Sequence, residues 1–150
     1  MAPVKRELNR ASAVATVTLA VGLAGCGGGG PSREQFVANA NRACAEVSAG
    51  ALPKSKTIED VARNGSLVVA ADKRELAKLR KVAVPDKDRP KFDEFVRLVE
   101  QETVLAEREA SAAKRNDKPL LLAVDPLLSA KASGAATAAK QLGLRSCAEQ

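Results

Sequence analysis

Residues 91–115, KFDEFVRLVEQETVLAEREASAAKR, repeat apolar or small side chains at intervals of three and four. The recurring positions are Phe92, Phe95, Val99, Thr103, Ala106 and Ala110. This spacing places them along one side of an α-helix, and the charged residues between them occupy the other side. The stretch therefore predicts a long amphipathic helix that needs other helices to cover its apolar side.

The rest of the chain supplies three such partners. A first helix is expected after the N-cap residue Ser32 and before Gly50, a second after Thr57, and a last one from Leu121 to a stop at Gly143. Their apolar sides comprise, in chain order, Phe36, Ala40, Ala43 and Val47; Ile58, Val61, Gly65, Val68, Leu76, Leu79 and Ala83; and Leu121, Val124, Leu128, Ala132, Ala135, Ala139 and Leu142.

Local signals divide these helices. Asn64-Gly65 is expected to bend or break the second helix, and Asp125-Pro126 to kink the last helix or start it afresh. Residues 85–90 and 116–119 are expected to be short connections, and no segment alternates like a strand. Because short connections between long amphipathic helices favour antiparallel neighbours, we predict an all-α fold, a small antiparallel helical bundle.

The N-terminal segment carries the basic residues Lys5, Arg6 and Arg10, followed by an uncharged and mostly apolar run over residues 11–23. This order is typical of a signal peptide. The run is shorter than the roughly 20 apolar residues that a membrane-spanning helix needs, so a permanent transmembrane helix is the weaker interpretation.

The run ends in Leu23-Ala24-Gly25-Cys26. A Leu three positions before a Cys, with small residues between them, resembles the lipobox of bacterial lipoprotein precursors. The resemblance implies cleavage before Cys26 and acyl chains on Cys26, so that the exported protein is lipid-anchored to the outer face of the cell membrane. The alternative is an ordinary signal peptide with an unmodified Cys26. We expect a cleaved signal peptide over residues 1–25, an acylated Cys and Gly-rich tether over residues 26–31, and a helical bundle domain over residues 32–150.

The other two cysteines form an even pair once Cys26 carries lipid. Because disulfides persist in exported proteins, we predict a disulfide between Cys44 and Cys147, the alternative being two unpaired buried thiols. In an up-down bundle of four full-length helices these two residues would lie near opposite ends. We therefore expect three long helices plus a shorter N-terminal helix that lies near the C-terminal end of the chain, with residues 50–56 as an extended connection.

Two segments around these cysteines also resemble a wider group of proteins. Ala43-Cys44-Ala45 and residues 142–148, LGLRSCA, follow the layout of small Ala-rich helical lipoproteins of high-GC Gram-positive bacteria. This loose resemblance implies a cell-envelope location and the same two-cysteine link, and it carries over no catalytic residues.

A basic run ends the second helix, where Arg74, Lys78 and Lys81 share one side. This side is a candidate contact for anionic lipid headgroups. The commoner explanation is pairing with the acidic third helix, for instance Lys81 with Glu94 and Arg74 with Glu102, because charge runs usually mark a solvated surface.

The residue inventory argues against catalysis. There is no His, Trp or Tyr, which excludes Ser-His-Asp and Cys-His catalysis, metal sites that use His, and most aromatic sugar-binding platforms. Glu100 with Glu102, and Glu107 with Glu109, are two residues apart and point to different sides of a helix. We therefore expect no catalytic residues, no metal, no cofactor and no enzymatic activity.

These observations lead to a function hypothesis with two alternatives. The leading one is a membrane-anchored, non-enzymatic interaction or accessory module that binds another protein of the cell envelope. The first alternative is a binder of anionic lipid or cell-wall polymer through a basic helix face, and the second is an enzyme that uses carboxylates alone, which would need a carboxyl of raised pKa in a cleft. The net charge of +6 is not clustered as in nucleic-acid binders, so no nucleic-acid partner is expected.

Overall fold

The structure is a computed structural model, and it describes residues 30–48, 55 and 57–149. In these residues all regular secondary structure is helical and no strand is present. The helices are α1 (Arg33–Ser48), α2 (Ile58–Leu79), α3 (Arg89–Lys114), α4 (Lys118–Leu142) and α5 (Arg145–Ala148). The predicted all-α fold is confirmed.

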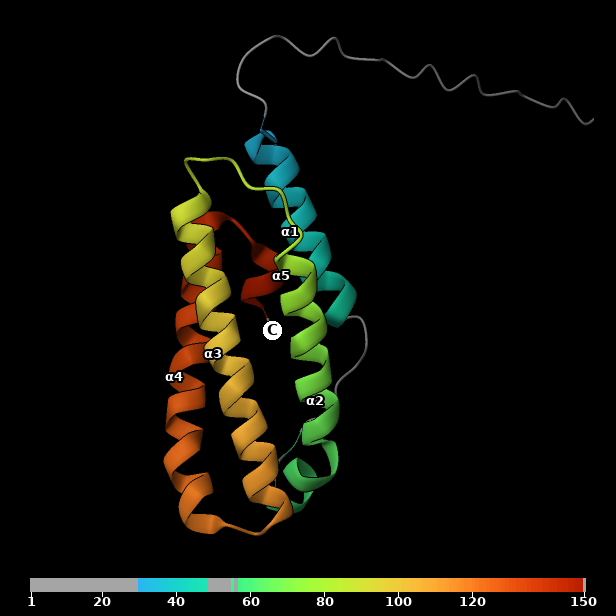
Figure 1. The fold of residues 1–150 in the computed structure, drawn as a ribbon, viewed down its shortest axis with the longest axis vertical. Coiled ribbons are helices and arrows are strands. Elements are labelled where there is room, and N and C mark those ends of the chain that lie inside the picture. The colour runs from blue at the N-terminus through green and yellow to red at the C-terminus, as the bar shows by residue number, and fades with distance from the viewer. Residues whose placement is uncertain (1–29, 49–54, 56, 150) are drawn as a thin grey trace, which may run out of the picture.

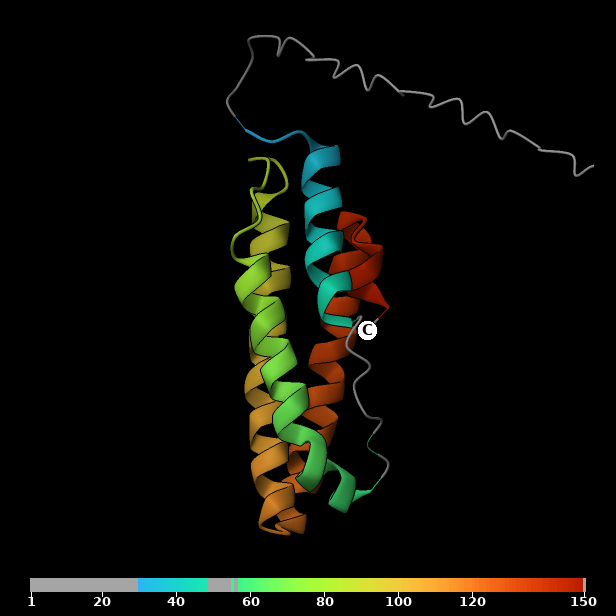
Figure 2. The ribbon, with the colours of Figure 1, turned by 90° about the vertical axis from the view of Figure 1, so that its right-hand side faces the viewer.

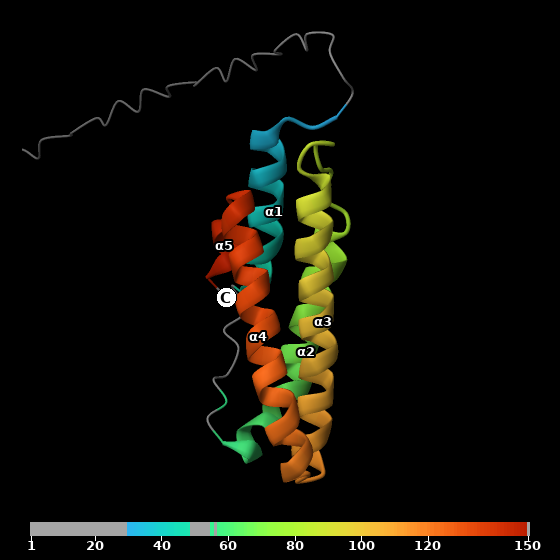
Figure 3. The same ribbon diagram turned by 90° about the vertical axis from the view of Figure 1, so that its left-hand side faces the viewer.

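The three long helices α2, α3 and α4 run antiparallel to their neighbours along the length of the bundle (Figure 1). The shorter α1 covers only one end, and Figure 2 shows that α2 begins at the opposite end. α1 and α5 lie side by side where α4 finishes (Figure 3). This is the expected bundle of three long helices and a displaced N-terminal helix; most of the expected connection over residues 50–56 lies outside the described residues.

The core is densest at the end of the bundle where α1 packs. Its largest fully buried side chains are Phe36, Phe95, Leu79, Leu142, Leu144 and Cys44. Phe36 from α1 meets Phe92 from α3 edge to face, with ring centroids 5.2 Å apart, an arrangement that aromatic pairs prefer. The apolar sides predicted for the first and third helices are buried as expected, whereas Ala83 is exposed beyond the end of α2 and Val84 is buried instead.

Capping residues fix the helix ends. The Ser32 hydroxyl accepts a hydrogen bond from the Gln35 backbone N–H (3.1 Å), and the Gln35 side chain accepts one from the Ser32 N–H (3.0 Å). Thr57 and Asp60 make the same reciprocal pair at the start of α2. Gly143 ends α4 with a left-handed φ of 79°, so the predicted signals at Ser32, Thr57 and Gly143 are confirmed. α3 and α4 begin earlier than predicted, at Arg89 and Lys118, inside the expected connections.

Neither of the two predicted interruptions breaks its helix, although the first turns of α2 lie at an angle to the rest of that helix (Figure 2). α2 is continuous through Asn64-Gly65, where the missing side chain of Gly65 instead allows close contact with Ala110 of α3. α4 is continuous through Pro126 and already includes Pro119 in its first turn, a position where proline loses no helical hydrogen bond. The four-residue helix α5 was not expected.

Hydrogen bonds hold α1 against the C-terminal residues. The Arg33 guanidinium pairs with the buried Asp88 and also donates to the Leu142 carbonyl (3.3 Å). The Asn41 amide oxygen accepts a hydrogen bond from the Ser146 N–H (2.8 Å). The Cys44–Cys147 disulfide adds a covalent link between α1 and α5, with the two Cα atoms 5.1 Å apart, and confirms the predicted pairing.

Candidate functional site

A cavity of about 80 Å³ lies inside the bundle next to the disulfide. Its polar wall is formed by Asp72 and Glu75 from α2 and by Glu102 and Thr103 from α3. The remaining wall consists of Val99, Ala132, Ala135, Ala136 and Cys147. The short alanine side chains of α4 leave this space open, and its size suits a few water molecules rather than a ligand of several hundred cubic ångströms.

The acids of α2 lie inside because they occupy positions of its apolar pattern. The residues Asp72, Glu75, Leu76 and Leu79 follow the helical spacing i, i+3, i+4 and i+7, so they lie on one side of α2. Leu76 and Leu79 are buried there. Glu75 is only 6% exposed. A carboxylate among the buried positions of an amphipathic helix was the signal in the sequence that could have identified this cavity.

The carboxyls of the cavity have unusual proton affinities. Burial, and then the charge of Asp72, raise the pKa of Glu102 to about 7. Burial also raises the pKa of Asp72 to about 6. Among the described residues lining the cavity there is no Lys or Arg. Because no cation offsets the cost of two buried negative charges, the two carboxyls retain protons in mildly acidic solution.

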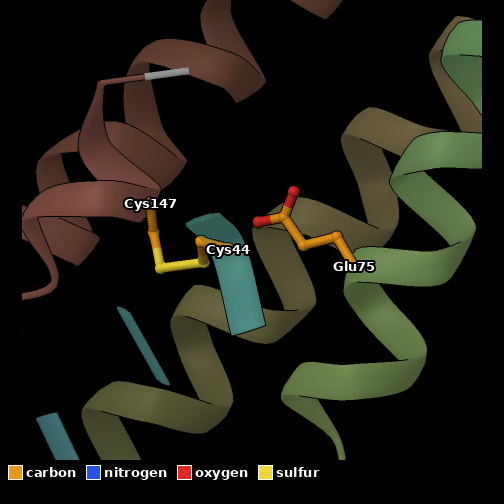
Figure 4. A group of neighbouring side chains, drawn as sticks. All are labelled: Cys44, Glu75 and Cys147. Carbon is orange, nitrogen blue, oxygen red and sulfur yellow. A yellow bond between two sulfur atoms is a disulfide. The ribbon is translucent and has the colours of Figure 1, made fainter. Parts of the chain in front are cut away.

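The disulfide and Glu75 form a second group beside this cavity (Figure 4). The carboxylate of Glu75 points toward the disulfide, and the donor atoms of Cys44, Glu75 and Cys147 all lie within 4.8 Å of one another. All three residues are buried, and they come from α1, α2 and α5. Within the described part of the chain, this is the one cluster of Cys, His, Asp or Glu close enough to share a metal ion. In this structure the two sulfurs are bonded to each other as a disulfide. They are therefore not thiolates, the form of Cys that binds metal ions.

Raised pKa values are the feature that a carboxylate-only enzyme requires, but the cavity does not suit a substrate. Its volume of about 80 Å³ is several-fold below that of typical ligand pockets. The Thr103 hydroxyl, which also faces this region, donates to the Val99 carbonyl of its own helix (2.9 Å). Glu100 is exposed while Glu102 lines the cavity, in agreement with the expectation that residues two apart diverge.

The predicted ion pairs between the second and third helices are wrong in register. Arg80 rather than Lys81 pairs across the hairpin, with Glu100 (2.8 Å), while Glu94 pairs with Arg97 of its own helix. Lys73 pairs with Glu107, and Glu102 faces Asp72 in the cavity instead of Arg74. Lys73 and Arg80, which pair with α3, each precede the predicted residue of α2 by one position. The carboxyls of Asp72 and Glu102 therefore face each other inside the bundle.

The basic side of Arg74, Lys78 and Lys81 is not one continuous surface. Lys78 pairs with Glu46 of α1, and this hydrogen bond lowers the pKa of Glu46. Arg74 and Lys81 are exposed. Docking of α1 therefore neutralises the middle residue of the predicted headgroup contact.

The sequence pattern did not predict the shallow surface groove between α3 and α4. It has a volume of about 560 Å³, and Val104 and Leu127 lie in it with 42% and 54% of their surface exposed. Arg97, Arg108 and Lys131 flank these side chains, and Glu100, Gln101 and Leu105 complete the wall. Val104 and Leu127 lie outside the apolar sides predicted for their helices, so helical spacing gave no indication of the groove.

The predicted lipidation residue Cys26 and its lipobox lie outside the described residues. None of the described helices combines the length and apolar character needed to cross a membrane. No family model, curated protein or solved structure matches this chain.

Proposed function

We propose that this protein is an exported, lipid-anchored and non-enzymatic accessory module of the bacterial cell envelope, and that it binds another envelope protein through the groove between α3 and α4. The lipobox-like residues Leu23 to Cys26 support the anchor. The Cys44–Cys147 disulfide supports an oxidising compartment, because disulfides are rare in reducing cytosol. The small cavity argues against turnover of a substrate.

The exposed apolar pair in the groove is the observation that carries the binding proposal. Val104 and Leu127 lie in one hollow, and the cations Arg108 and Lys131 border it. A partner segment with apolar side chains flanked by Asp or Glu complements this surface, since apolar centres and charged rims are typical of protein interfaces. An anionic lipid surface suits the groove less well, because Glu94 and Glu100 pair with arginines at or beside it.

Photo-crosslinking in intact host cells tests this proposal. A photoreactive residue at Val104 or Leu127 is expected to form adducts with one and the same protein, through a peptide that carries apolar and acidic residues. Leu67 of α2 is the matched control, because it is also a large apolar side chain and is 56% exposed. Adducts with lipid or glycan alone, or equal adducts from Leu67, would contradict the proposal.

Charge reversal separates this groove from the basic side of α2. Arg108→Glu with Lys131→Glu is expected to reduce the crosslink yield at Val104. Arg74→Glu with Lys81→Glu makes the same change in charge on α2 and just after its end, and is expected to leave the yield unchanged. The opposite result would favour binding of anionic lipid or wall polymer through α2, and a steep loss of binding with added salt would support that alternative.

A further inference from the structure

The Glu75 carboxylate lies buried beside the Cys44–Cys147 disulfide. The cluster contains two sulfurs and one carboxylate oxygen from three different helices, all within 4.8 Å (Figure 4). We propose that two-electron reduction of the Cys44–Cys147 disulfide converts this cluster into a metal site, in which the two thiolates and the Glu75 carboxylate bind Zn²⁺ or a similar divalent cation.

The required movements are small. In a tetrahedral zinc site with the usual bond lengths, neighbouring donor atoms are about 3.5 to 3.8 Å apart. The three donor atoms already lie within 4.8 Å of one another, so shifts of about 1 to 2 Å are enough to reach these separations. Rotation of the three side chains can supply these shifts, so the three helices keep their places.

The donor set and its surroundings suit zinc. Two thiolates and one carboxylate oxygen are ligands that Zn²⁺ accepts, and three protein ligands leave a fourth position for water. The adjoining cavity is lined by Glu75 and Cys147 and has room for that water.

The chemical step needs a dithiol as reductant. One thiolate of the dithiol attacks a sulfur of the disulfide, and the second closes a new disulfide within the reductant, which transfers two electrons and two protons and leaves two S–H groups on the protein. The metal then replaces these two protons, which pass to water. Exchange is expected to start at Cys147, which is 8% exposed, whereas Cys44 is fully buried. The bound metal would keep α1 connected to α5 in the absence of the S–S bond.

Cobalt titration of the reduced protein tests this inference. The protein used is the full chain with Cys26→Ala, so that Cys44 and Cys147 are its only cysteines. It is reduced with a dithiol in detergent without oxygen. The reductant is then removed and the protein is titrated with Co²⁺. Thiolate-to-cobalt charge-transfer and tetrahedral ligand-field absorption are expected, and Zn²⁺ should remove both. The oxidised protein is expected to show neither.

Matched variants show whether a built site or merely two free thiols bind the metal. Glu75→Gln keeps the side-chain volume and is expected to weaken binding at least tenfold, since even changes beyond the direct ligands cost about 10- to 100-fold. Glu102→Gln changes a carboxyl of the same cavity that is not a ligand, and wild-type affinity is expected. Equal affinity of Glu75→Gln and wild type, or no cobalt absorption in the reduced protein, would overturn the inference, even if reduction unfolds α1. The proposed envelope function is unaffected by either result, because the groove lies on other residues.

Discussion

Gly65 allows a close approach of α2 to Ala110 of α3, and Gly65→Ala tests that packing. A Cβ atom on residue 65 would lie 2.6 Å from the Cβ and 3.2 Å from the Cα of Ala110. Carbon atoms in contact prefer about 3.5 to 4.0 Å, so α2 and α3 would have to separate by several tenths of an ångström or more. Ala110 has no flexible side chain that could rotate away, and its backbone is part of α3.

Two opposing effects decide whether Gly65→Ala raises or lowers the free energy of unfolding. Alanine in place of glycine inside a helix gains about 1 kcal/mol of helix propensity. Overpacking of a close contact costs typically about 1 to 3 kcal/mol, and a clash that includes backbone belongs near the upper end. We therefore expect Gly65→Ala to lower the free energy of unfolding by about 1 to 2 kcal/mol, measured by urea denaturation followed by circular dichroism.

Gly134→Ala is the matched control in α4. There a new Cβ would meet only the methyl carbons of Leu98, at 3.6 and 3.7 Å, which is ordinary contact. The helix-propensity gain should then prevail and stabilise the protein by up to about 1 kcal/mol. Adding Ala110→Gly to Gly65→Ala removes the clashing methyl group and should recover part of the loss. If Gly65→Ala proved as stabilising as Gly134→Ala, the close packing of α2 on α3 would be refuted.

Three further predictions concern the cavity, the disulfide and a cap. Asp72 and Glu102 hold protons in the native state that they release in the unfolded state, so the free energy of unfolding should fall as the pH rises from about 4 to 7. The rise in the pKa of Glu102 from 4.5 to about 7 corresponds to at most about 3 kcal/mol, and the partial exposure of this carboxyl to solvent reduces the effect to about 1 to 2 kcal/mol. Glu102→Gln should therefore be more stable than wild type at pH 8 but not at pH 4.5 in thermal unfolding, and a parallel pH profile would contradict the raised pKa. Replacing Cys44 and Cys147 by Ser opens a link across 103 residues and should cost about 2 to 5 kcal/mol, with amide exchange in α1 accelerating first; unchanged protection of α1 would show that noncovalent contacts suffice. Thr57→Ala removes the cap of α2 and should cost about 1 kcal/mol in urea denaturation, whereas no loss would mean that the capping pair is not formed in solution.

The helices were predictable because their signals are local. Ser32, Thr57 and Gly143 define ends through hydrogen bonds or a φ value that depend on a few neighbouring residues. The cysteine pair was predictable from the number of cysteines and from the expectation of export, and it then indicated the displaced position of the first helix. These inferences needed no knowledge of how the helices rotate about their axes.

The cavity and the groove depend on that rotation. The rotation of α2 about its axis decides whether Arg74 or Asp72, which are two residues apart, faces Glu102, and periodic patterns rarely fix helix orientation so closely. Gly65 predicts a bend or a break from the sequence alone, because its close contact is visible only when Ala110 is opposite. Contacts of this kind join residues that are far apart in the sequence, and helix packing decides them. The sequence pattern indicates only approximately which side of each helix takes part.

The placement of the disulfide also determines how the protein responds to mechanical force. Cys44 and Cys147 enclose α2, α3 and α4 in a covalent ring. A force that pulls the chain before α1 against the chain after α5 would pass through the S–S bond. It could straighten only residues outside the ring, before Cys44 and after Cys147, and not the three long helices. If the tether holds the protein at a moving membrane, the helices that carry the groove would keep their structure while α1 is under tension.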